Sequence, residues 1–321
     1  MKKLKLKLST THIILFSFFA AVLIGAVLLM LPVSSAKGEW TPFVDALFTS
    51  TTATCVTGLV VAPTFSAWST FGHIVILFLI QIGGLGVITV VSIIAMMFHK
   101  KMGLSDRLLL QDAFNLNTLS GLSQFVKKVV LGTFLVEGMG ALLYMIVFVP
   151  EFGLKGIWIS VFTAISAFCN AGIDIIAENS LCNYVHNPIV NLTTCLLIFF
   201  SGIGFIVWWD VARVLKLRKK RKIKVLKSLT LHSKIAIATT LVLIFSGAIF
   251  IFLFEYNNPQ TMKDFTIYQK IQASFFQSVT TRTAGFATIP QENLTNASAI
   301  LCLLWMFIGG SPVGTAGGIK T

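Results

Sequence analysis

Long apolar segments alternate with short polar ones along this chain. A transmembrane helix needs about 20 mostly apolar residues. The segments that approach or exceed this length are residues 11–32, 70–98, 129–149, 187–211, 233–254 and 297–310. We expect each to be a membrane-spanning helix, the last of which continues into a glycine-rich segment. The pattern therefore predicts an all-α polytopic membrane protein.

One uncharged run is too long for a single span. No Asp, Glu, Lys or Arg occurs between residues 46 and 99. As one helix this run would measure about 80 Å, whereas the hydrocarbon core of a bilayer is about 30 Å thick. The stretch WTPFVDALFTSTTAT (40–54) is too short and too polar at its end to cross. We predict a short helix that enters from outside, returns as the polar strip TTATCVTGLV (51–60), and precedes a full span at 70–98.

The same order recurs in the second and last thirds of the chain. Residues 158–175 are apolar before they break at Asn-Ala-Gly, and residues 271–290 break at Thr-Ala-Gly. The strip glycines Gly58, Gly172 and Gly285 lie 114 and 113 residues apart. This spacing indicates an internal repeat of span, short pore helix, polar strip and span. The predicted repeats are residues 1–118, residues 119–228, which end in a basic cytoplasmic linker, and residues 229–321.

The polar strips have the composition of an ion pathway. Non-helical backbone at membrane depth is tolerated only where it is buried in protein or lines a water-filled path. Several strips around one axis can direct their carbonyl groups inward and replace the hydration shell of a cation. Glycine permits the backbone angles this requires, and the end of the preceding helix places partial negative charge toward the pore. The predicted selectivity filter consists of Val56, Thr57, Gly58, Asn170, Ala171, Gly172, Thr283, Ala284 and Gly285.

The alternative is that these small residues only allow close helix packing. We favour packing for the glycine clusters IGGLG (82–86) and SGIGF (201–205), which lie inside the spans that follow the strips. For the three strips we favour the filter, because the short helix and the polar break recur together.

Composition and charge support a membrane protein and orient it. Only 12% of the residues are charged and the mean hydropathy is +0.86, whereas about a quarter of the residues of a soluble domain are charged. With the N-terminus inside, the inner segments 1–10, 99–128 and 213–234 hold 4, 5 and 10 of the 25 Lys and Arg residues. The positive-inside rule then indicates a cytoplasmic N-terminus. The basic run 216–227 is first a topology signal; it can also contact anionic lipid or a cytoplasmic partner, and we expect no nucleic acid.

The sequence offers little catalytic chemistry. The spacings of the five cysteines match no metal motif, and no nucleophile–base pair falls at one membrane depth. We expect no enzyme activity, no catalytic residues, no cofactor and no structural metal. Glu137, inside a span, is either a functional carboxylate or a helix-packing residue, and these alternatives stay open. Asp174 follows Gly172 by two positions and is the acidic outer residue nearest to a strip, where negative charge would attract cations.

The strips TCVTGL, FCNAGID and TTRTAGF, together with GGSPVGTAGGIKT (309–321), resemble the Trk/Ktr/HKT superfamily of potassium transporters. The layout is most similar to the KtrB-type membrane subunit. The resemblance implies a central pore of four M1–pore helix–filter–M2 repeats, K+ as the transported ion and Na+ as a candidate coupling or activating ion. Three repeats are present here, and their interval places a fourth filter glycine near position 398 or 399. Gly58 matches the potassium-selective pattern, since related sodium-selective plant members carry Ser there.

The resemblance also implies an intramembrane gate loop beneath the filter. Its residues would be Gly309, Gly310, Ser311, Gly314, Thr315, Gly317, Gly318 and Lys320. Lys320 lies either just past the membrane edge or within the electrostatics of the gate.

The implied setting is a multi-pass protein of the plasma membrane. It would form a homodimer, contact membrane lipid and bind a cytoplasmic nucleotide-binding regulatory subunit of KtrA type. The alternative function is a truncated, non-conducting scaffold that docks such a subunit. Because the fourth repeat is not among the 321 residues, we expect this chain alone not to restore potassium uptake.

Cysteine labelling tests the orientation. A thiol placed at Ser35 or Asn257 is expected to react with a membrane-impermeant reagent on intact cells, because both positions lie in outer segments. A thiol at Lys219 is expected to react only after permeabilisation. Labelling of position 219 in intact cells would contradict the orientation and the pore that depends on it.

Overall fold

The computed structural model describes residues 10–87, 89–90, 92, 108, 111, 122–221 and 225–320. The regular structure of these residues consists of helices, accompanied by two isolated β-bridges. The predicted all-α class is confirmed. The basic residues of segment 1–9 and the repeat boundary at 118 lie outside the described residues.

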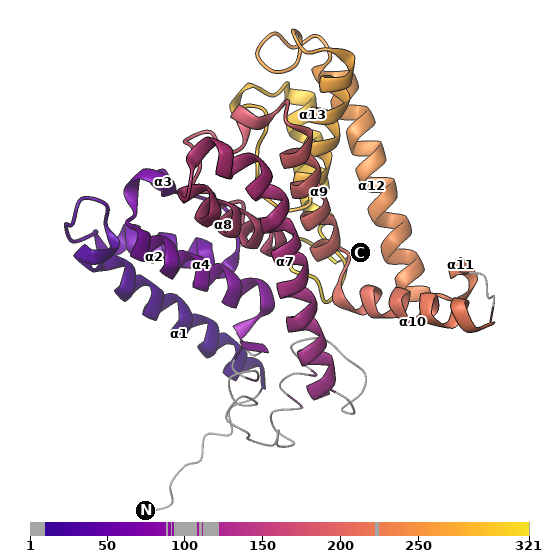
Figure 1. The fold of residues 1–321 in the computed structure, drawn as a ribbon, viewed down its shortest axis with the longest axis horizontal. Coiled ribbons are helices and arrows are strands. Elements are labelled where there is room, and N and C mark those ends of the chain that lie inside the picture. The colour runs from indigo at the N-terminus through magenta and orange to yellow at the C-terminus, as the bar shows by residue number, and fades with distance from the viewer. Residues whose placement is uncertain are drawn as a thin grey trace, which may run out of the picture.

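Within the described residues, three helices are long and apolar enough to cross a membrane: α1 (Thr10–Met30), α7 (Leu122–Phe152) and α12 (Leu231–Glu255). A shorter helix follows each of them, then a third helix (Figure 1). The shorter helices are α2 (Phe43–Cys55), α8 (Lys155–Cys169) and α13 (Ile267–Thr280). The third helices are α4 (Thr70–Leu85), α9 (Pro188–Gly202) and α14 (Asn296–Phe307). Shorter elements are η1 (Pro32–Ser34), α3 (Thr64–Ala67), η2 (Cys182–Tyr184), α11 (Val225–Ser228) and η3 (Gln291–Asn293).

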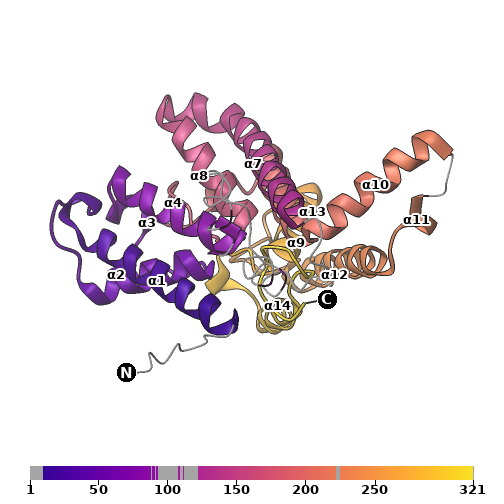
Figure 2. The ribbon, with the colours of Figure 1, turned by 90° about the horizontal axis from the view of Figure 1, so that it is seen from below.

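The three groups of helices are joined side by side. Helix α4 of the first group packs against α8 of the second, and α9 of the second packs against α13 of the third. Figure 2 shows the groups around a common centre, into which the loop after α14 runs. Large exposed apolar side chains such as Leu131, Leu142 and Leu253 lie on the long helices, as a lipid-facing surface requires. The short helix α8, by contrast, is enclosed by α4, α7 and α9.

The predicted continuous span over residues 187–211 was wrong. The structure contains α9 and, after a break, α10 (Phe205–Arg221), and the two helices are bent by 93°. Gly204 at the break has φ +92°, and a Cβ there would meet the carbonyl oxygen of Pro312. The amide of Phe205 donates to the carbonyl of Val313 at 3.0 Å. A run of apolar residues does not reveal this break, because its cause is a loop more than 100 residues further along the chain.

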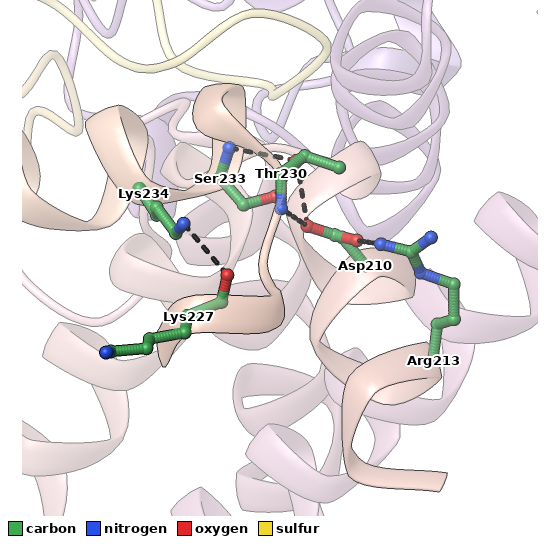
Figure 3. A network of polar contacts seen from close by, with 6 residues as sticks. All are labelled: Asp210, Arg213, Lys227, Thr230, Ser233 and Lys234. Carbon is green, nitrogen blue, oxygen red and sulfur yellow. Dashed lines mark hydrogen bonds and ion pairs between the residues drawn. The ribbon is translucent and has the colours of Figure 1, made fainter. Parts of the chain in front are cut away.

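Helix α10 therefore extends away from the three groups (Figures 1 and 2). Its return to α12 is fixed by one carboxylate (Figure 3). Asp210 accepts hydrogen bonds from the amide and the hydroxyl of Thr230, each at 2.8 Å, and from Arg213 at 2.5 Å. Thr230 is the N-cap of α12, where its hydroxyl accepts from the amide of Ser233. Asp210 thus joins α10 to the first turn of α12.

Replacing Asp210 tests this junction. Asp210→Ala leaves the Thr230 amide without its acceptor, and we expect it to cost about 2–3 kcal/mol of stability. Arg213→Ala is the matched control, because the Arg213 side chain is 56% exposed and an exposed ion pair contributes less than about 1 kcal/mol. The midpoint of thermal unfolding in detergent measures both changes. A larger loss in the Arg213 variant would contradict this account.

Candidate ion-binding site

The three strips share one backbone conformation. In each strip the glycine and the residue two positions before it have positive φ. The pairs are Val56 (56°) and Gly58 (80°), Asn170 (59°) and Gly172 (65°), and Thr283 (65°) and Gly285 (84°). A non-glycine residue with positive φ is uncommon, so its presence in all three strips marks a specific backbone path. When every second residue of a strip has a left-handed backbone conformation, successive carbonyl groups can face the same side.

The strips also meet in space, although more than 110 residues separate them along the chain. A Cβ built on Gly58 would lie 2.6 Å from the carbonyl oxygen of Ala171. A Cβ built on Gly172 would lie 2.6 Å from the Cα of Gly285. The second strip therefore touches both of the others, and no side chain fits at these contacts. The sequence predicted one shared site for these residues, and the structure places them together after the ends of α2, α8 and α13.

The loop after α14 lies directly against the strips. The side-chain amide of Asn170 donates to the Thr315 hydroxyl at 2.7 Å and to Ser201 at 3.0 Å. The amide of Gly317 donates to the Thr283 hydroxyl at 2.7 Å. Two strips are thus hydrogen-bonded to the segment that sequence analysis predicted as a gate loop.

The loop itself forms a narrow turn. The amide of Gly309 donates to Ile319 and that of Gly310 to Gly317, both at 3.1 Å. The ammonium group of Lys320 donates to the carbonyl of Ala316, so this cation lies against the loop. Further contacts join the loop to α9. The amide of Ser311 donates to the carbonyl of Gly202 at 2.8 Å, and the amide of Thr315 donates to the carbonyl of Ser201 at 3.3 Å. Gly314 also packs against the carbonyl oxygen of Ser201. Gly318, with φ +70°, packs against Gly309.

A cavity of about 420 Å³ lies between the first and third strips. Val56, Thr57 and Thr283 line its walls, and Gly317 and Gly318 of the loop line it as well. The space is large enough for several water molecules. The strip residues therefore border a space that a hydrated ion can occupy.

Arg282 is a buried cation directly before the third strip, and the sequence did not mark it as a site residue. In the structure it is only 5% exposed, and its guanidinium donates to the carbonyl of Gly309 at 2.8 Å. Arg282 follows the end of α13, where a cation offsets the partial negative charge of the helix end. Its neighbours Thr283 and Thr281 suggested a polar strip, but nothing local in the sequence indicated its partner 27 residues away.

Asp174 lies beyond the second strip. Its carboxylate accepts from the amide of Ile176 at 3.2 Å. Burial raises the pKa of Asp174 above its ordinary value, and hydrogen bonds from Ile176, Ser180 and Ala177 partly oppose that rise. The group therefore loses its negative charge at a higher pH than an ordinary aspartate does.

Glu137 lies beside Cys169, the residue directly before the second strip, at 4.0 Å from its Sγ atom. Its two carboxylate oxygens accept from the side-chain amide of Gln81 at 3.1 and 3.3 Å. The Sγ atom of Cys169, the last residue of α8, is 3.8 Å from Gln81. Gly84 adjoins this cluster, because a Cβ on it would lie 2.5 Å from Cys169. The contacts support the helix-packing interpretation of Glu137 and of the IGGLG cluster.

Comparisons with known proteins agree with this arrangement. The family model described as TrkH, cation transport protein, matches residues 2–321. The chain belongs to the TrkH family of cation transport proteins. The family is one of transporters rather than enzymes, which confirms the expected class of function.

Three known proteins illustrate the relationship. The potassium/sodium uptake protein NtpJ of Enterococcus hirae is 38% identical over the whole chain, which spans 69% of that protein. The Ktr system potassium uptake protein B of Bacillus subtilis is 42% identical over 96% of the chain and 67% of its own length. The crystal structure of the potassium transporter TrkH from Vibrio parahaemolyticus superposes with a TM-score of 0.73 at 17% identity. That match covers all of this chain and 60% of the other, and it shows the shared fold.

Proposed function

We propose that this TrkH-family chain contributes the pore through which potassium ions enter the cell. The observation that carries the proposal is the meeting of three strips with the same left-handed backbone pattern at the ends of three short helices. Carbonyl groups arranged in this way replace the water around a cation. The residues proposed to bind the ion are the nine strip residues named from the sequence. The names of NtpJ and of the Bacillus subtilis protein, both potassium uptake proteins, support the choice of ion.

Na+ is a second ion that the transporter is proposed to use. NtpJ is named as a potassium/sodium uptake protein, so we include Na+ as a candidate coupling or activating ion. Gly58 supports a preference for K+, because it adds no side chain at its close contact with Ala171. No cofactor is needed for this function.

The loop from Gly309 to Lys320 is proposed as the gate. It lies against Asn170 and Thr283, and its Gly317 and Gly318 border the cavity. A loop in that position obstructs the path below the strips. Its glycine-rich backbone can adopt other conformations at low cost, so it can move aside.

We further propose a plasma-membrane location with the N-terminus in the cytoplasm, a homodimer, and a cytoplasmic nucleotide-binding regulatory subunit of KtrA type. The Lys and Arg distribution supports the orientation. The Bacillus subtilis relative is named as part of a Ktr system. Helix α10 extends from the three helical groups (Figure 2), and its exposed basic residues Arg213, Lys216 and Arg218 are available for contact with a partner or with lipid headgroups.

Uptake measurements test the function and the ion-binding residues together. The open reading frame that contains these 321 residues is expected to restore growth of potassium-uptake-deficient cells in low potassium. Gly58→Ser should reduce discrimination against Na+ about tenfold, because the strained backbone and the crowded Ala171 carbonyl cost about 1–2 kcal/mol. Gly172→Asp should be more severe, since it adds a charge at the contact with Gly285. Rubidium uptake in competition with Na+ measures these effects.

Gly202→Ser is the control for these variants. A Cβ on Gly202 would lie 3.8 Å from its nearest neighbour, Ala316, which is an ordinary contact. We therefore expect unchanged ion discrimination in that variant at matched abundance. If Gly202→Ser altered selectivity while Gly58→Ser did not, the ion-binding residues would be wrongly assigned; no uptake by the unsubstituted protein would contradict the function itself.

The gate loop is tested by shortening it. Deletion of residues 310–317 removes the backbone that lies below the strips, and we expect maximal uptake to rise several-fold. Uptake that stays the same or falls, at normal abundance in the membrane, would contradict the gating role.

A further inference from the structure

Each filter strip is held by one hydroxyl residue of the short helix before it. These residues are Thr52 on α2, Ser166 on α8 and Thr280 on α13. All three are buried, with exposed fractions of 3%, 0% and 5%. The sequence alone does not mark these residues, because their hydrogen bonds form only with the folded strip that follows each helix.

The backbone carbonyl of each residue accepts a hydrogen bond from the residue just before the strip glycine. The Thr57 amide donates to the Thr52 carbonyl at 3.0 Å. In the other strips the matching distances are 2.8 Å from Ala171 to Ser166 and 2.9 Å from Ala284 to Thr280. The same bond thus recurs at the same place in all three strips.

The side-chain hydroxyl of each residue holds the position just after the glycine. The Thr52 hydroxyl accepts from the Leu59 amide at 3.0 Å. The Ser166 hydroxyl accepts from the Ile173 amide at 3.1 Å and donates to the Ile173 carbonyl at 2.5 Å. The Thr280 hydroxyl donates to the carbonyl of Phe286 at 2.6 Å. A single residue therefore forms hydrogen bonds with the strip on both sides of its glycine.

Other buried hydroxyls of the same helices make no such contact. Thr54 on α2 and Thr163 on α8 are 1% and 0% exposed, and neither hydroxyl has a hydrogen-bond partner among the described residues. Burial of a hydroxyl is therefore not enough to produce a hydrogen bond with the strip. Such a bond forms only at the helix position whose side chain reaches the end of the strip.

We propose that Thr52, Ser166 and Thr280 are positioning residues that set the ion discrimination of the filter. They do not reach the ion through these contacts. They fix the peptide groups that flank each strip glycine, and thereby the distance between carbonyl groups that a cation experiences. The inference rests on the proposed function, in which the strips bind potassium.

Substitutions that remove only the hydroxyl test the proposal. Thr52→Val and Ser166→Ala keep the backbone bond and lose the bonds of the hydroxyl, which in Thr52 include a contact of 2.7 Å with the Thr57 hydroxyl besides the bond from Leu59. Each is expected to raise the KM for potassium and to weaken discrimination against Na+ by about fivefold, because the amide of Leu59 or of Ile173 loses its acceptor. Thr52→Ser and Ser166→Thr retain a hydroxyl and should behave as the unsubstituted protein does.

Thr54→Val and Thr163→Val are the matched controls. They make the same kind of change on the same helices but break no hydrogen bond, so KM and discrimination should stay within about twofold of the unsubstituted protein. All variants are compared at equal membrane abundance, by rubidium uptake against potassium and sodium concentration. Unchanged KM and discrimination in both Thr52→Val and Ser166→Ala would overturn the proposal, even if their abundance fell, since that result fits a purely structural role.

A second measurement does not depend on transport. In the purified protein, amide hydrogen exchange of the segment 56–60 should be faster in Thr52→Val than in Thr54→Val, because the Leu59 amide has lost its acceptor. Equal exchange rates in the two variants would show that the Thr52 hydroxyl does not hold the strip. If the unsubstituted product of the whole open reading frame failed to take up rubidium, the proposed function would be contradicted, while the exchange comparison would still decide whether the hydroxyl holds the strip.

Discussion

The central constraint on this molecule is that backbone amide and carbonyl groups at membrane depth must find partners inside the protein. A helix satisfies this by itself, whereas a strip that leaves the helix does not. In each strip the amide before the glycine is taken by a carbonyl of the preceding helix, as with Thr57 and Thr52. What such a strip can then offer to its surroundings is carbonyl oxygen. Under the proposed function, the same constraint that makes the strips costly gives them their affinity for cations.

A second departure from helix geometry obeys the same rule. The break between α9 and α10 leaves the carbonyls of Ser201 and Gly202 without their usual helical partners. Amides of the loop, from Thr315 and Ser311, donate to them. In return the Phe205 amide at the start of α10 donates to Val313 of the loop. The helix break and the loop therefore supply hydrogen-bond partners for each other's backbone groups, and neither is stable in this form without the other.

The sequence was sufficient for features whose cause is local. The position of each short helix, the strip after it and the glycine within it followed from a run of apolar residues that ends in small polar ones. The sequence was insufficient where the partner is distant. The bend at Gly204 depends on Pro312, and the burial of Arg282 depends on Gly309. The hydroxyls of Thr52, Ser166 and Thr280 are intermediate, because each partner is six or seven residues away but is reached only once the strip has folded back.

The contacts between strips have a consequence for how a chain built from repeats can change over generations. Lipid-facing residues such as Leu131 and Leu253 can be exchanged for other apolar residues in one copy without regard to the others. The strips cannot, because Gly58 lies against Ala171 and Gly172 lies against Gly285. Added bulk in one copy has to be accommodated by the backbone of its neighbour. A substitution at the outer surface of one copy therefore leaves the other copies unaffected, whereas a substitution at a meeting point requires the neighbouring copy to change as well.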